Sequence, residues 1–143
     1  GYLSVAEKCD VALRVLLEAV PYLSVPELKE MFHPLPKLLK SCPEKTQATI
    51  YRIVIKAVGF HRWDTFDENL KCWCRDILLG GLSTSNDEVR RTVFDFWCNS
   101  HLLADSVTER LRNLLELLGQ PHIHASFLAH CCSLMLELCK VSP

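Results

Sequence analysis

Apolar residues recur along this chain with the three- and four-residue spacing of amphipathic helices. Polar positions fill the gaps, and Ser, Pro and Gly interrupt the pattern where one helix gives way to the next. No stretch shows the sustained alternation of a half-buried strand. The pattern predicts seven helices, over about residues 5–20, 25–42, 43–58, 64–80, 86–99, 107–118 and 121–138.

The first predicted helix shows how the buried faces are assigned. Its apolar positions follow one helical stripe, and that stripe should turn toward the core. We therefore expect the following side chains to point inward: Val5, Cys9, Ala12, Leu13, Leu16, Leu17 and Val20.

The predicted helix starts are spaced about 20 residues apart. Four of them have the S-x-x-E pattern of a capping box, beginning at Ser4, Ser24, Ser85 and Ser106. Two helices for every ~40 residues is the period of HEAT and armadillo repeats. The predicted fold is therefore all-α, an α-solenoid of about three to three and a half HEAT-like helix pairs with about seven antiparallel helices. It forms a single segment over residues 1–143.

Pro, Gly and acidic residues predict the remaining boundaries. Pro34 and Pro36 should kink or split the second helix near His33, since a proline removes a backbone donor. Gly59 is a plausible residue just after the third helix. Asp64 should stand at the start of the fourth helix, which we expect to stop at Gly80-Gly81.

Composition limits the classes of function. The 143 residues are 49% hydrophobic, and 16 Lys and Arg oppose 17 Asp and Glu, giving a net charge of −1. Direct nucleic-acid contact usually requires a basic excess, so none is expected from this segment. Nor is there an apolar run long enough for a membrane span. The eight Cys suit a reducing compartment, because many fall on apolar helical faces. The chain starts without Met, and we expect it to be a piece of a longer protein.

Three Cys and His pairs could suggest a metal site: Cys72-x-Cys74, Cys131-Cys132 and His122-x-His124. Structural zinc sites prefer two to four residues between paired Cys. On a helix, residues two apart point roughly 200° from each other, so Cys72 and Cys74 could not bind one ion together. We predict no metal-ligating residue.

Catalytic signatures are also weak. His33, His61, His101 and His130 could partner a Cys nucleophile, but no family signature surrounds any Cys. His61-Arg62-Trp63-Asp64 faintly resembles a kinase catalytic loop and lacks the Asn that should follow it. Gly80-Gly81 is not a phosphate-binding loop. We predict no catalytic and no cofactor-binding residue.

Aromatic and loop residues have structural interpretations. Trp73 and Trp97 lie in phase with apolar neighbours and should pack in the core, whereas Trp63 is a candidate surface residue. The loop 83–85 could be phosphorylated, but Ser85 is better explained as a helix N-cap. Asp87-x-x-Arg90 follows the D-x-x-V-R pattern of HEAT repeats loosely, with an Arg able to pair across to the next repeat.

A run of residues in the last third goes beyond a generic helical repeat. In its order and spacing the chain resembles the helical scaffold that lies upstream of the kinase domain in the phosphatidylinositol-3-kinase-related kinase family. The residues that carry this resemblance are Val93-Phe94-Asp95-Phe96-Trp97, Leu102, Leu103, Thr108-Glu109-Arg110-Leu111, Leu114, Leu115, Pro121, Phe127, Leu128, Leu136, Glu137, Ser142 and Pro143.

The resemblance implies a very large nuclear serine/threonine kinase that acts in non-homologous end joining, is loaded on DNA ends by the Ku heterodimer, and uses ATP and magnesium. None of its catalytic or ATP-binding residues matches this segment, which would be a non-catalytic scaffold. The partners of the segment would be neighbouring HEAT repeats of the same chain. The alternative is an independent HEAT- or armadillo-like adaptor that binds peptides in a concave groove. A zinc- or thiol-dependent enzyme is a remote third possibility.

Overall fold

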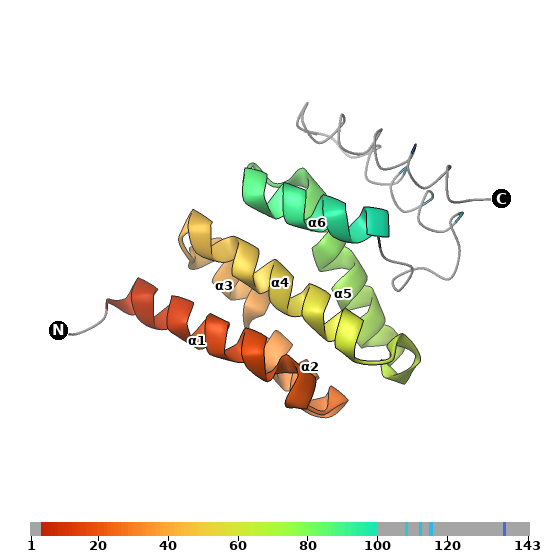
Figure 1. Ribbon diagram of the computed structural model, residues 1–143, viewed down its shortest axis with the longest axis horizontal. Helices are drawn as coiled ribbons and strands as arrows, with labels where there is room; N and C mark the ends of the chain where they lie inside the picture. The colour runs from red at the N-terminus through yellow and green to blue at the C-terminus, as the bar shows by residue number, and fades with distance from the viewer. Residues whose placement is uncertain (1–3, 100–107, 109–111, 113–114, 116–135, 137–143) are drawn as a thin grey trace. The chain divides into compact units, whose positions relative to one another are not determined.

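The computed structural model describes residues 4–99 and four single residues further on, Thr108, Arg112, Leu115 and Leu136. Within 4–99 every regular element is helical, which confirms the all-α class (Figure 1). The predicted helices over 107–118 and 121–138 lie outside the described stretch. The elements are α1 (Val5–Ala19), η1 (Val20–Tyr22), α2 (Val25–Phe32), α3 (Leu35–Ser41), α4 (Glu44–Phe60), η2 (Trp63–Thr65), α5 (Glu68–Gly80), η3 (Gly81–Ser83) and α6 (Asp87–Asn99).

Two of the predicted caps form as expected. The Ser4 hydroxyl accepts a hydrogen bond from the Glu7 amide at 3.1 Å, where α1 begins. Ser24 and Glu27 form a complete capping box, since each side chain accepts from the other residue's backbone amide. The predicted break in the second helix is also confirmed. It divides α2 from α3 at His33 and Pro34, because a proline in a helix interior cannot donate to the preceding turn.

Three predicted boundaries are wrong. Gly59 does not follow the third helix but lies inside α4, which continues to Phe60. The fourth helix does not begin at Asp64. That residue belongs to the short turn η2, and α5 starts only after Asp67, whose Oδ1 accepts from the Leu70 amide at 2.8 Å. Ser85 is not the cap of α6, because the neighbouring Asn86 takes that role.

The chain divides into two compact units, Gly1–Cys74 and Arg75–Pro143, and each is described by itself. In the first unit α1 and α4 lie side by side and run in the same direction (Figure 1). Their carboxyl ends meet where His61 Nε2 lies 3.0 Å from the Val20 carbonyl oxygen. Two parallel helices joined through the α2–α3 pair are the arrangement that stacked helix pairs produce. Within this unit the helical-repeat prediction therefore agrees with the packing.

Helix α4 supplies more of the described core of the first unit than any other element does. Its buried positions are spread over most of the helix circumference, as expected for a helix that is covered on several sides. The buried side chains of α4 are Thr46, Ala48, Thr49, Ile50, Tyr51, Ile53, Val54, Ala57 and Val58.

Helix α1 is covered on only part of its predicted inner face. Leu13 is buried, as expected, but Val5 is 84% exposed and Ala12 is exposed as well, so these two inward assignments are wrong. Val11 and Val15 are also exposed on this helix. The first unit thus presents several apolar side chains of α1 to solvent.

In the second unit α6 packs against the turn η3. Trp97 is 1% exposed, and its indole Nε1 donates to the Leu78 carbonyl oxygen at 3.3 Å. The predicted core position of Trp97 is therefore confirmed, and its polar atom is satisfied, as a buried indole requires. The other buried apolar side chains described here are Leu78, Leu79, Leu82, Val89, Val93 and Phe96.

Candidate functional site

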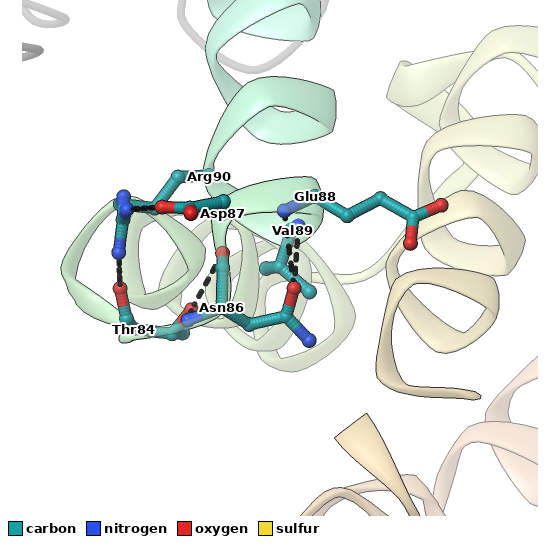
Figure 2. Close-up of polar contacts among 6 residues, drawn as sticks. All are labelled: Thr84, Asn86, Asp87, Glu88, Val89 and Arg90. Atoms are coloured by element: carbon teal, nitrogen blue, oxygen red, sulfur yellow. Dashed lines mark hydrogen bonds and ion pairs between the residues drawn. The ribbon is translucent and has the colours of Figure 1, made fainter. Parts of the chain in front are cut away.

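A cluster of hydrogen-bonded polar groups lies at the start of α6 (Figure 2). Asn86 is 5% exposed, and its Oδ1 accepts from the amides of Glu88 and Val89 at 3.1 and 3.2 Å. The Asn86 amide in turn donates to the Thr84 hydroxyl at 3.1 Å. Asn is a strong N-cap because its carbonyl reaches the free amides of the first turn. This cluster fixes the residue at which the segment after η3 ends and α6 begins.

Arg90 completes the cluster from one turn further along α6. Its side chain is only 7% exposed, yet its guanidinium donates from Nη1 to the Thr84 carbonyl at 2.5 Å and pairs through Nη2 with the Asp87 carboxylate (Figure 2). The planar guanidinium can reach both acceptors at once, whereas a lysine could not. Arg90 Nε is buried without a hydrogen-bond partner. The Asp-x-x-Arg pattern therefore ties α6 to its own preceding loop.

The Cys candidates do not form a reactive or metal-binding group among residues 4–99. Cys72 is exposed and Cys74 is fully buried, as the opposite directions expected of residues two apart on a helix require. Burial raises the pKa of the Cys74 thiol to about 12, so this thiol stays protonated and unreactive near neutral pH. The described residues contain no group of three or more potential metal ligands. Cys131, Cys132, His122 and His124 lie outside the described stretch.

The two His candidates among the described residues, His33 and His61, lie at helix ends. His33 is exposed next to the α2–α3 break. His61 is the C-cap of α4, and one of its ring nitrogens contacts the Val20 carbonyl oxygen. This contact joins the ends of two helices. His101 and His130 fall outside the residues that the structure describes.

The segment that resembled a kinase catalytic loop is a packed turn. Arg62 pairs with Asp64 at 3.1 Å, and the Trp63 ring lies 5.4 Å from the Phe66 ring, measured between centroids. Lys71 Nζ lies 5.9 Å from the centre of the Trp63 ring. Trp63 is half-buried, so its assignment to the surface is confirmed only for part of the ring. These contacts give Arg62, Trp63 and Asp64 a structural role in the turn.

A surface pocket that the sequence does not predict lies between α2 and the first part of α5. It has a volume of about 190 Å³ and is lined by Lys29, Phe32, His33, Asn69, Leu70 and Trp73. Phe32 and Trp73 stack with ring centroids 5.1 Å apart and an angle of 16° between the planes. Trp73 is therefore half-buried against the core, as predicted, and also open to the pocket. Only the packing of α2 against α5 brings these six residues together, so no sequence signal could have found them.

An ion pair borders this pocket. Lys29 Nζ lies 2.5 Å from Asp67 Oδ2, and the two side chains are 44% and 51% exposed. Hydrogen bonds from Lys29 and then from the Leu70 amide lower the pKa of the Asp67 carboxyl. Asp67 thus caps α5 and holds Lys29 with its two oxygens.

The fold and these clusters together define an all-α segment, in which the polar groups described above mainly cap helices and fix loops. None of the described helices is long and apolar enough to cross a membrane.

Comparison with known proteins gives the family. Residues 5–143 match the family model described as DNA-PKcs, CC5, and the chain belongs to this family. This confirms the resemblance seen in the sequence and extends it from the last third to almost the whole chain.

Three curated relatives share the name DNA-dependent protein kinase catalytic subunit. The chain is 30% identical to that of Dictyostelium discoideum over 80 residues, 35% identical to that of Xenopus laevis over 66 residues, and 23% identical to that of Mus musculus over 142 residues. These matches cover 55%, 46% and 96% of this chain and 2%, 2% and 3% of the relatives. The chain therefore spans only a small fraction of the length of these relatives. No solved structure matches it.

Proposed function

We propose that this chain is a non-catalytic scaffold segment of a very large nuclear serine/threonine kinase that repairs DNA double-strand breaks by non-homologous end joining. The observation that carries the proposal is the family match over residues 5–143. The names of the relatives supply the kinase activity, which belongs to the whole protein. In that parent, ATP and magnesium serve the kinase domain, and the Ku heterodimer and DNA ends are partners.

The use of the polar side chains supports a scaffold role for the segment itself. Asn86 and Arg90 stabilise a helix start, His61 joins two helix ends, and Asp67 caps α5. A catalytic site would instead direct several such groups toward one reacting atom. The near-neutral charge of −1 also favours protein contacts over a direct grip on DNA.

The exposed apolar residues of α1 suggest where a neighbouring repeat would pack. Val5, Val11 and Val15 are 84%, 48% and 63% exposed. Helical repeats bury such faces against the next helix pair. Neighbouring HEAT repeats of the same chain are therefore the proposed partners of this segment, which would be an interior piece of an α-solenoid.

Substitutions in the full-length kinase can test the non-catalytic role. His33→Ala, Cys72→Ser and Asp64→Asn remove exposed groups that could have belonged to an active site. Each should leave the DNA-activated kcat and the KM for ATP within about twofold of wild type, because single surface changes rarely disturb a distant site. Val93→Asp places a charge at a fully buried position of α6 and should reduce assembly of the kinase on Ku-bound DNA ends. A large loss of kcat in one of the three surface variants, with normal assembly, would refute the proposal.

Binding experiments on the 143-residue chain separate the remaining alternatives. Calorimetry with Mg-ATP should detect no stoichiometric binding, and fluorescence anisotropy with a labelled DNA duplex should detect no salt-dependent complex. Elemental analysis that found stoichiometric zinc would instead favour a metal-dependent enzyme. The coding sequence beyond residue 143 distinguishes the adaptor alternative, since an independent adaptor would not continue into a kinase domain.

A further inference from the structure

The pocket between α2 and α5 combines an apolar floor with a polar rim. Phe32 and Leu70 are almost fully buried at 2% and 4% exposure, and half-buried Trp73 stacks on Phe32. Lys29, His33 and Asn69 are exposed at the rim. A few polar groups around an apolar floor are the usual composition of a ligand site, because the floor supplies affinity and the rim supplies orientation.

The size of the pocket limits what it can hold. A cavity of about 150 Å³ can hold one benzene molecule, and this pocket measures about 190 Å³. It therefore has room for one ring-sized group, which could contact the Trp73 and Phe32 rings at an edge or an offset. A whole helix or a large cofactor would not fit, whereas one aromatic side chain of a peptide would.

The charges at the rim favour an acidic neighbour of that side chain. Lys29 is the lining residue with a permanent charge, and no carboxylate lines the pocket. Lys29 gives one of its three N–H donors to Asp67, which leaves donors for a second acceptor. The next acid on α5, Glu68, lies 3.6 Å from Lys71 Nζ and is matched there. An incoming carboxylate would thus meet a cation rather than an unpaired acid.

We propose that this pocket binds an acidic peptide by accepting one of its aromatic side chains, with Lys29 contacting an adjacent carboxylate. His33 and Asn69 can pair with the peptide backbone at the rim. This inference concerns the 143-residue chain itself and does not depend on the proposed role in the kinase.

Peptide titrations followed by NMR test the proposal directly. The probe is a blocked tripeptide with phenylalanine between two glutamates, and the reporters are the Trp73 indole and the Asn69 side-chain amide. One ring and one ion pair should give a Kd on the order of 1 mM. Three matched peptides replace the phenylalanine by alanine, both glutamates by lysine, or both glutamates by glutamine. All three should bind at least about fivefold more weakly.

A rim variant and a matched control locate the binding. Asn69→Asp adds a negative charge at the rim and should weaken the glutamate peptide about fivefold at low salt. The new acid lies in the first turn of α5, where the helix dipole favours it, so the fold should persist. Lys37→Gln removes an exposed cation of α3 that does not line the pocket and should change nothing. Equal binding of any of the three matched peptides, no saturable shift of either reporter at several times 1 mM, or an unchanged affinity in Asn69→Asp would overturn the proposal.

Discussion

Replacing Asn86 by alanine should loosen the start of α6 more than any other single truncation in its cap. The substitution removes the acceptor of two hydrogen bonds, to the amides of Glu88 and Val89, and the second of these lies in a buried position. Loss of an N-cap side chain costs about 1 kcal/mol, with a range of about 0.5–2. Because Asn86 is only 5% exposed, water can replace the lost acceptor poorly, and we expect a cost of about 1.5–2 kcal/mol.

Amide hydrogen exchange measures this cost locally, without assuming that the two units unfold together. A loss of 1.4 kcal/mol is a tenfold change in an equilibrium constant, so exchange at Glu88 and Val89 should quicken by about 10- to 30-fold in Asn86→Ala. Asn86→Asp keeps a capping oxygen and should remain within about threefold of wild type.

Ser85→Ala is the matched control, because the sequence pattern alone assigned the cap to Ser85. That residue is exposed, and its truncation should cost less than about 0.5 kcal/mol. If Ser85→Ala quickened exchange at Glu88 and Val89 as much as Asn86→Ala does, the assignment of the cap to Asn86 would be refuted.

Three further predictions concern other described contacts. Iodoacetamide at pH 8 should modify exposed Cys72 and spare Cys74, whose pKa is raised to about 12, until urea unfolds the chain. Both Cys lie on the tryptic peptide 72–75, so fragmentation of this peptide in tandem mass spectrometry locates the label, and equal labelling would contradict the burial. The pKa of Asp67 is lowered in the folded state, so its stabilising contribution is present above the unfolded value and is lost as the pH falls through the folded one. Urea unfolding should therefore show that Asp67→Asn lowers stability at pH 6 but no longer does so once the pH is well below the folded value, and a difference that persisted in acid would argue against the ion pair. Trp97→Phe removes the hydrogen bond to the Leu78 carbonyl and part of a buried ring. Thermal unfolding followed by circular dichroism should show that the free energy of unfolding falls by about 2 kcal/mol. An unchanged midpoint would mean that the hydrogen bond contributes nothing.

The local part of the fold was predictable from the sequence. The Ser24 capping box and the break at Pro34 depend on residues within one helical turn, and the structure has both where the sequence placed them. The helical class follows from apolar spacing, which is also a local property.

The wrong boundaries depend on side-chain contacts that the residue types alone do not specify. Ser85 and Asn86 can both cap a helix, and the contacts of the Asn86 amide and of Arg90 with Thr84 decide between them. Gly59 could have ended α4, but the helix runs on to Phe60, and His61 then meets the carbonyl of Val20 at the end of another helix. His61 and Val20 are 41 residues apart, so their contact leaves no local pattern in the sequence.

The candidate pocket was unpredictable for the same reason. Phe32 and Trp73 each follow the apolar spacing of their own helix, which predicts a core position and nothing more. Their stacking depends on how α2 packs against α5. The sequence therefore assigns Trp73 to packing but does not show that this side chain borders a pocket.

The buried guanidinium of Arg90 also constrains how this chain can diverge among its relatives. Its two acceptors are the Asp87 carboxylate and a backbone carbonyl, and removal of Asp87 alone would leave a buried charge half-matched. Lysine cannot substitute for the planar fork. We therefore expect Asp87 and Arg90 to be either both kept or both replaced in a relative, while the exposed neighbours Ser83 and Ser85 should vary independently. An alignment of this family would record that history as covariation between two residues less than one helical turn apart.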